Sequence, residues 1–291
     1  MNKHISRRTI QVTLGCFWLL DGFLQLQRQM FTKNFALKII APNEVSQPTI
    51  IHNPIHLAVH IILLHPALWD CAFAAIQFLI GYLLLRQTTV RQGLILSTIW
   101  GLSVWFIGEG LGGLFSGSAS LIMGMPGAAL LYVILGIGAW PHRHKDKTQP
   151  ASWLTAVWAT VWLTGASLQL TAGQNSAPAL AAMIKGMARG APGWLAALDD
   201  GVSRHIIELG SAVIIWLVFI EALIGILIFL GHFWRTLAVI AGIIFITLAW
   251  VIGQALGEYY TGFATDLNTA PFIILLGLAV LGSRGMTIDI T

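Results

Sequence analysis

Eight long apolar runs divide the chain, and most approach the roughly 20 residues that a helix needs to cross a membrane. Only 10% of the 291 residues are charged, whereas soluble domains carry about 25%. The sequence therefore predicts an all-α polytopic membrane protein with eight transmembrane helices in a lipid bilayer. The runs, of which the fourth and eighth are short, cover residues 10–30, 66–86, 93–113, 124–140, 152–172, 206–230, 236–256 and 269–283.

The positions of the basic residues predict the orientation of these helices. Lysine, arginine and histidine residues gather before the first run and after the second, fourth, sixth and eighth runs, at 1–8, 86–91, 142–147, 232–235 and 284. Cytoplasmic loops are typically enriched in lysine and arginine. We therefore expect a multi-pass protein of the cell membrane with both termini in the cytoplasm. Under this interpretation the net charge of +4 reflects topology, and no nucleic-acid partner is expected.

The second half of the chain repeats the first. At an offset of 144 residues, "WLLDGFLQL" (18–26) aligns with "WLTGASLQL" (162–170). At an offset of 145, "WFIGEGLGGLFSGSASLIMGMP" (105–126) aligns with "WVIGQALGEYYTGFATDLNTAP" (250–271), with eight of 22 positions identical. Because four spans return the chain to its starting side, the halves are expected to be parallel repeats. The predicted domains are residues 1–145 and 146–291, each a four-helix membrane repeat.

The first span carries a glycine-punctuated pattern in "LGCFWLLDGFLQL" (14–26), formed by Gly15, Phe17, Gly22 and Leu26. This pattern and the four-span unit resemble the DoxX-like membrane proteins. The chain departs from that family at Gln25, where a lysine is common, and in being two fused units. The resemblance implies a link to redox chemistry at the membrane, since one branch of the family oxidises thiosulfate with quinone; the sequence itself names no cofactor. No catalytic residue is carried over from it.

Polar side chains inside the predicted spans define a candidate site, because ionisable groups in a membrane are costly and usually face the bundle interior. Two pairs related by the repeat exchange a carboxylate for an amide: Gln77 aligns with Glu221, and Glu109 with Gln254. Hydrogen bonding between helices, at about 0.6–2 kcal/mol per contact, is the structural alternative. The candidate catalytic residues are Asp21, Glu109 and Glu221, and the candidate binding residues are Gln25, Gln77, Gln169 and Gln254.

Glycine and proline predict where this site lies. Gly108 and Gly112 make a small-xxx-small pair next to Glu109, and such pairs allow close helix packing. Pro126 and Pro271 open a short span at corresponding places of the two halves. Interrupted segments at matching positions of two repeats point to a binding site. We expect the site between the third and fourth spans of each half, on the extracytoplasmic side.

A row of histidines is the second candidate site. His52, His56 and His60 are four residues apart and share one face of a helix. His56 and His60 are the candidate metal ligands, because this spacing suits zinc or copper. A polar face on an interfacial helix is the alternative, and it explains these residues adequately. The second half has Asp200 and Arg204 at the aligned positions, a salt-bridge spacing, so a metal site would not be common to both halves.

Three functions remain open from the sequence. The first is a quinone-linked redox protein, in which the glutamates handle protons and the glutamines orient a small polar ligand. The second is a transporter for a small solute or ion, since a carboxylate near the midplane suits proton coupling. The third is a non-catalytic subunit that packs against other membrane subunits. The sequence does not decide whether the protein is an enzyme.

Overall fold

The computed structural model describes residues 5–117, 119–141, 149–171, 175–187 and 189–283. Every regular element within these ranges is a helix, as the sequence predicts, and the described ranges contain no strand. The basic segment 142–147 and Arg284, both used to predict orientation, lie outside the described residues.

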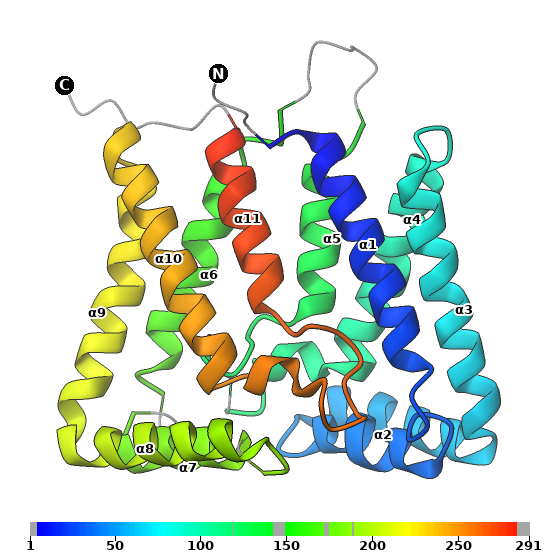
Figure 1. Ribbon diagram of the computed structural model, residues 1–291, viewed down its shortest axis with the longest axis horizontal. Coiled ribbons are helices and arrows are strands. Elements are labelled where there is room, and N and C mark those ends of the chain that lie inside the picture. Colours follow the sequence, from blue (N-terminus) through cyan, green and yellow to red (C-terminus); the bar gives the residue numbers. More distant parts are fainter. Residues whose placement is uncertain (1–4, 118, 142–148, 172–174, 188, 284–291) are drawn as a thin grey trace.

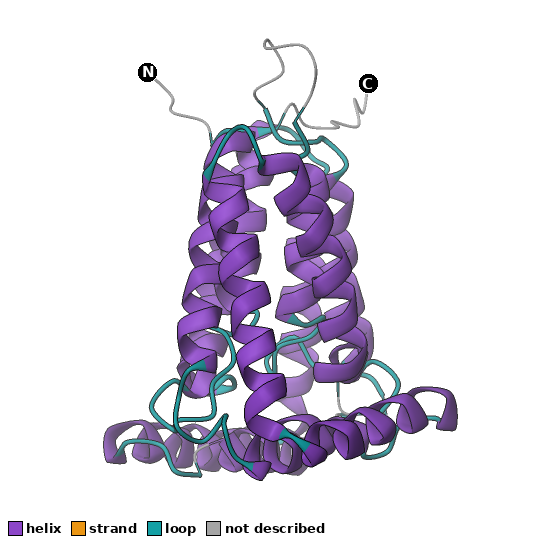
Figure 2. Ribbon diagram, turned by 90° about the vertical axis from the view of Figure 1, so that its right-hand side faces the viewer, coloured by secondary structure: helices purple, strands orange, loops and turns teal. Residues whose placement is uncertain are grey.

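The helices form an upright bundle that stands on a transverse layer (Figure 1). Successive upright helices run in opposite directions, and the transverse layer extends beyond the bundle on two sides (Figure 2). The transverse helices are α2 (Thr49–Leu64), α7 (Ala177–Met187) and α8 (Gly193–Leu209). The upright helices are α1 (Arg7–Gln25), α3 (Pro66–Leu85), α4 (Val90–Ser103), α5 (Ala128–Gly138), α6 (Leu154–Leu168), α9 (Ser211–Leu227), α10 (His232–Ile252) and α11 (Ala270–Gly282).

Fewer helices are long enough to cross a membrane than the sequence predicts. Three described helices have the required length and apolarity: α3, α10, and α4 together with the π-helix η3 (Val104–Gly108). A fourth is added if α8 and α9 count as one span, but they meet at a bend of 102°. The predicted eight spans are not supported by helix length, since α5 has 11 residues and α11 has 13.

The apolar runs are longer than the helices because the backbone leaves the helical conformation inside these runs. The run 206–230 breaks at Gly210, whose φ of 60° and ψ of −142° separate α8 from α9. Before α5 and α11, the chain forms short 3₁₀ turns, η4 (Gly110–Gly113) and η5 (Ala255–Glu258), and then loops. Hydropathy is similar for an apolar loop and an apolar helix, so it does not report this difference.

The two turns follow the same left-handed path. The φ angles are 52°, 59°, 65° and 71° at residues 110–113 and 45°, 57°, 75° and 54° at residues 255–258. Glycine adopts this region freely, whereas other residues pay a steric cost in it. The first turn has three glycines, but the second holds the same path with Ala255, Leu256 and Glu258. The two turns are 145 residues apart, which is the offset of the sequence repeat in this segment.

Helix packing is also repeated between the halves. Helix α1 packs on α3 as α6 packs on α9, and α4 packs on α5 as α10 packs on α11. Contacts between α5 and α11 join the two halves. The bundle core is rich in aromatic side chains, of which Trp158, Trp162, Tyr132 and Phe272 are almost fully buried.

Candidate functional site

Two cavities meet where the upright bundle reaches the transverse layer. The larger, about 560 Å³, is lined by polar side chains that include Lys38, Asn43, Glu258 and Asn268, and we call it the polar cavity. The smaller, about 310 Å³, is lined mainly by apolar side chains that include Phe35, Trp69, Phe73 and Trp100, and we call it the aromatic cavity. Both are lined by Ile39, Gly108, Glu109, Thr265 and Asp266.

Glu109 lies at the junction of the two cavities, directly after η3. Its Oε1 accepts a hydrogen bond of 3.0 Å from the backbone N–H of Ala129, in the first turn of α5. A carboxylate is favourable there because the N-terminus of a helix carries partial positive charge. Oε2 is buried and has no hydrogen-bond partner among the described residues. One oxygen of Glu109 therefore stabilises a helix, and the other is free for a ligand or a proton.

Gly127 makes room for this free oxygen. A Cβ at this position would lie 2.1 Å from Oε2 of Glu109, and the φ of Gly127 is +104°. Both the close approach and the positive φ exclude a side chain here. The chain before α5 is therefore shaped around the carboxyl group of Glu109.

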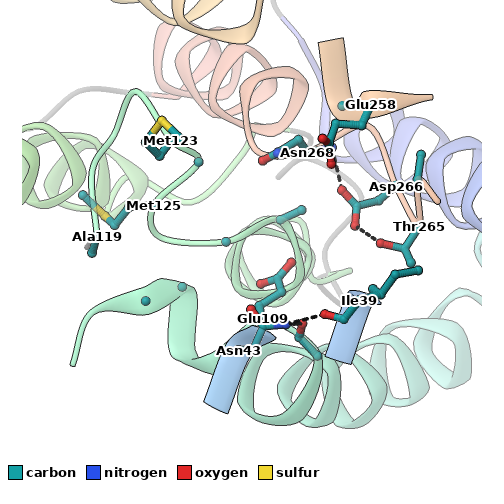
Figure 3. A pocket seen from close by; sticks show the side chains of 18 of the residues that line it. Ile39, Asn43, Glu109, Ala119, Met123, Met125, Glu258, Thr265, Asp266 and Asn268 are labelled. Carbon is teal, nitrogen blue, oxygen red and sulfur yellow. Dashed lines mark hydrogen bonds between the residues drawn. The ribbon is translucent and has the colours of Figure 1, made fainter. Parts of the chain in front are cut away.

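Asp266 faces the same cavity from the other half of the chain, in the loop between η5 and α11 (Figure 3). It accepts hydrogen bonds from the backbone N–H of Asn268 at 2.5 Å and from the hydroxyl of Thr265 at 3.0 Å. Burial raises the pKa of Asp266 above its usual value, and burial also raises the pKa of Glu258. A raised pKa favours the neutral form of a carboxyl group, which can donate a hydrogen bond as well as accept one.

Sequence reasoning missed Asp266 for two reasons. Residues 257–268 lie between the predicted seventh and eighth spans, in a connecting loop where a carboxylate is ordinary. The repeat alignment also pairs Asp266 with Leu121, so no exchange of polar groups drew attention to it. Its position could have been noticed, because Asp266 lies in the segment of the second half that aligns with the Glu109 segment of the first half.

The aromatic cavity contains two of the predicted glutamines. Gln25 is buried, and its Nε2 donates to Oδ1 of Asp70 on α3, a buried carboxylate that sequence reasoning also missed. Gln77 is 6% exposed, and its Oε1 has no hydrogen-bond partner among the described residues. The indole Nε1 of Trp100 is likewise buried and without a partner there. An acceptor and a donor are thus both free in this cavity.

The other predicted site residues line neither cavity. Gln254, aligned with Glu109, accepts a 3.3 Å hydrogen bond from the backbone N–H of Ala270 in the first turn of α11. The aligned pair therefore occupies the same structural position in both halves. Nε2 of Gln254 donates to the carbonyl oxygen of Leu121 at 3.5 Å.

Three more predicted residues have hydrogen-bond partners inside the bundle, although Oε1 of Gln169 and Oε2 of Glu221 are buried without one among the described residues. Nε2 of Gln169 donates to Oε1 of Glu221 at 3.3 Å, and both side chains are fully buried. Asp21 accepts a 2.6 Å hydrogen bond from the hydroxyl of Tyr132, whose ring stacks on Trp18. Of the seven predicted polar residues, the cavities thus bring together Gln25, Gln77 and Glu109, and leave out Asp21, Gln169, Glu221 and Gln254.

The second half closes part of the first half's site. The loop before α11 crosses to the first half, where the carbonyl oxygen of Ala264 accepts a 2.9 Å hydrogen bond from Nε2 of Gln27. The ammonium group of Lys38 lies 4.9 Å from the ring centroid of Phe263 in the same loop. The site therefore depends on both halves, whereas the sequence predicted a site within each half.

The predicted histidine row lies on α2, with His56 and His60 exposed and their Nε2 atoms 3.1 Å apart. On α8, the predicted pairing of Asp200 with Arg204 is replaced by two other contacts. The carboxylate of Asp200 pairs with Nζ of Lys185 at 3.4 Å, and Arg204 donates to the backbone carbonyl of Asp200. Lys185 lies on α7, so the residue spacing along α8 could not predict this contact.

Comparison with known proteins found no family model, no curated protein and no solved structure that matches the chain. The resemblance to the DoxX-like family therefore stays a prediction, and the site is interpreted from its own geometry.

Proposed function

We propose that the protein crosses the cell membrane with all its upright helices, as two parallel four-helix repeats over residues 1–145 and 146–291. Support comes from their alternating directions and from basic residues at the starts of α1, α4 and α10 and just after the end of α3, helix ends that lie at the same end of the bundle (Figure 1). These residues are Arg7, Arg86, Arg91 and Arg235. By the positive-inside rule this end is cytoplasmic. The short helices α5 and α11 fit this topology because irregular backbone is tolerated in a membrane where it lines a cavity. The transverse helices then lie on the extracytoplasmic surface.

We further propose that the aromatic cavity binds a quinone. The observation that carries the proposal is the pair of free polar atoms, Oε1 of Gln77 and Nε1 of Trp100, in an otherwise apolar cavity. A buried polar group without a partner costs about 1–3 kcal/mol, and a ligand that pairs it recovers this cost. A quinone carbonyl accepts from the indole N–H, and a quinol hydroxyl donates to the amide oxygen. Aromatic rings such as Trp69 and Phe73 suit the planar headgroup.

Glu109 is the proton carrier in this proposal. Reduction of a quinone to a quinol takes up two electrons and two protons. Oε2 of Glu109 has no hydrogen-bond partner from the described residues at the wall shared by the two cavities, and Asp266 also lines both. Protons pass from the polar cavity through these carboxyl groups to the ligand, and the electrons come from an extracytoplasmic reductant. The resemblance to the DoxX-like family agrees with this chemistry.

A transporter for a small cation is the second candidate. Among the described residues, the polar cavity is lined by the acidic side chains of Glu109, Glu258 and Asp266 and by one lysine, Lys38. Such an acidic cavity concentrates cations, and carboxylates in membrane proteins commonly mark ion pathways. This function uses the polar cavity and has no need of Gln77 or Trp100. A non-catalytic subunit would need neither cavity.

Quinone binding tests the first proposal. A short-chain quinone is titrated into detergent-purified protein, and binding is followed by tryptophan quenching and by equilibrium dialysis. Gln77→Leu and Trp100→Phe should each weaken binding about tenfold, the equivalent of about 1.4 kcal/mol. Trp216→Phe is the matched control, because Trp216 is exposed on α9 and lines neither cavity.

Unchanged affinity in both cavity variants would contradict the quinone proposal. Cation flux into proteoliposomes separates the second candidate. Flux that is lost in Asp266→Asn and kept in Gln77→Leu would favour transport.

A further inference from the structure

The exposed face of α2 gathers three histidines and a glutamate. Glu44 ends the 3₁₀ turn η2 (Ala41–Glu44), and its Oε2 lies 3.1 Å from Nδ1 of His56. The rings of His52 and His56 are stacked, with centroids 5.5 Å apart. His60 approaches the other side of the His56 ring, with an Nε2–Nε2 distance of 3.1 Å. The opposite face of α2 is apolar and packs inward, which fixes the histidine row at the surface.

Three of these side chains can bind one ion. One ligand atom each from Glu44, His52 and His56 lies within 4.8 Å of the others. Within the described ranges, this is the one group of three or more histidine, cysteine or acidic side chains with such geometry. Two imidazoles and a carboxylate form the ligand set of zinc sites that keep a fourth position open, and copper(II) accepts the same donors.

An ion pair between His56 and Glu44 is the simpler explanation, but it does not account for the whole cluster. It gives no role to His52 and His60, whose rings both contact the His56 ring. Exposed ion pairs also contribute little to stability. A metal ion binds neutral imidazoles, so stacked and adjoining rings suit it.

The aligned surface of the second half shows the contrast. His56 aligns with Asp200 and His60 with Arg204, and the carboxylate of Asp200 pairs with Lys185. The carboxylate on that face is therefore paired with a cationic side chain of the same protein. The first-half face has imidazoles at these positions instead.

We propose that Glu44, His52 and His56 bind one divalent transition-metal ion of the Zn²⁺ and Cu²⁺ class on the exposed surface of α2. His56 binds through Nδ1, the atom next to Glu44. His60 is a positioning residue that holds the His56 ring through Nε2, as outer-shell partners of metal-bound histidines commonly do. This inference stands independently of the quinone proposal, because none of these four residues lines either cavity.

The test is calorimetric titration of ZnCl₂ into full-length protein without a polyhistidine tag, treated with chelator and then freed of it. We expect one Zn²⁺ per chain with a Kd of about 1 µM or tighter. His52→Ala, His56→Ala and Glu44→Gln should each weaken binding by about 100-fold or more, and His60→Ala by about 10-fold. Bound Co²⁺ should give the visible absorption of a low-coordinate nitrogen and oxygen site.

His205→Ala is the matched control. His205 and Glu208 form a similar exposed pair on α8, with Nδ1 and Oε2 3.3 Å apart, but no third ligand group joins them in the described residues. This variant should bind Zn²⁺ as the unmodified protein does. Because the residues are at the surface, the variants should keep their melting temperature in chelator. Equal loss in His205→Ala, or a Kd that His52→Ala and His56→Ala leave unchanged, would overturn the assignment.

Discussion

The backbone N–H of Ala129 donates to Oε1 of Glu109 over 3.0 Å, while Oε2 of the same carboxyl group, where the two cavities meet, has no partner in the described part of the chain. The two oxygens therefore have different tasks. One completes the first turn of α5, and the other is available to a ligand. If Glu109 only capped α5, an amide oxygen would serve as well as a carboxylate oxygen, as that of Gln254 does at α11.

Substitution of Glu109 can separate these tasks. Glu109→Gln keeps an oxygen that accepts from Ala129, so the protein should keep its melting temperature but lose quinone-linked proton uptake. Glu109→Ala removes the acceptor as well, and loss of a helix cap costs about 0.5–2 kcal/mol. Thermal unfolding in detergent and proton uptake in proteoliposomes measure the two effects.

Gln254→Ala is the control for this pair. It should lower the melting temperature to a similar extent, because it removes the corresponding acceptor at α11, while quinone binding persists. Full proton uptake in Glu109→Gln would show that this carboxyl group is not the proton carrier.

Gly127→Ala should be among the most harmful glycine substitutions at the site. The added Cβ meets Oε2 of Glu109 at 2.1 Å, and the φ of +104° is strained for alanine. Gly117→Ala is the matched control, since its φ is +79° but a Cβ there meets nothing within 4 Å. The control should cost about 1–2 kcal/mol for the backbone alone, and Gly127→Ala should cost more.

A double substitution identifies the cause of that loss. If the contact with Glu109 is responsible, Glu109→Ala should cost less stability in the Gly127→Ala background than in the unmodified protein, which is a coupling between neighbouring sites. Equal melting temperatures for Gly127→Ala and Gly117→Ala would contradict the proposed contact.

Tyr132→Phe should destabilise the protein by about 1–3 kcal/mol, because it leaves the carboxylate of Asp21 buried without its hydroxyl partner. The ring and its stacking on Trp18 are kept. Asp21→Asn retains an oxygen that accepts from Tyr132 and should cost less. The melting temperatures of the two variants measure this difference. If Asp21→Asn kept its stability but lost quinone turnover, Asp21 would regain a functional role.

The sequence predicted the helical class and the correspondence of Glu109 with Gln254 correctly. Both residues follow an upright helix and cap the next one, so a one-to-one alignment carries this information. Helix length supports fewer spans than the sequence predicted, because hydropathy is similar for an apolar loop and an apolar helix. The left-handed turns at residues 110–113 and 255–258, with the loops that follow them, separate the long helices from the short ones.

The equivalence of Gln77 and Glu221 was less informative. Gln77 lines the aromatic cavity, whereas Glu221 is fully buried against Gln169. The sequence aligns their positions but does not show which neighbouring side chains leave a space. Asp266 was missed for a related reason, since a residue in a loop can approach any part of the molecule.

The crossing of the second-half loop over the first half has a consequence for how such a molecule diversifies. In a pair of identical subunits, each change in the loop would alter two equivalent sites together. Joined in one polypeptide, the two copies vary separately. Asp266 and Glu109 line the same cavities in one place, and their aligned counterparts Leu121 and Gln254 meet through a carbonyl–amide hydrogen bond in the other. Fusion thus allows one copy to become scaffolding while the other keeps its chemistry.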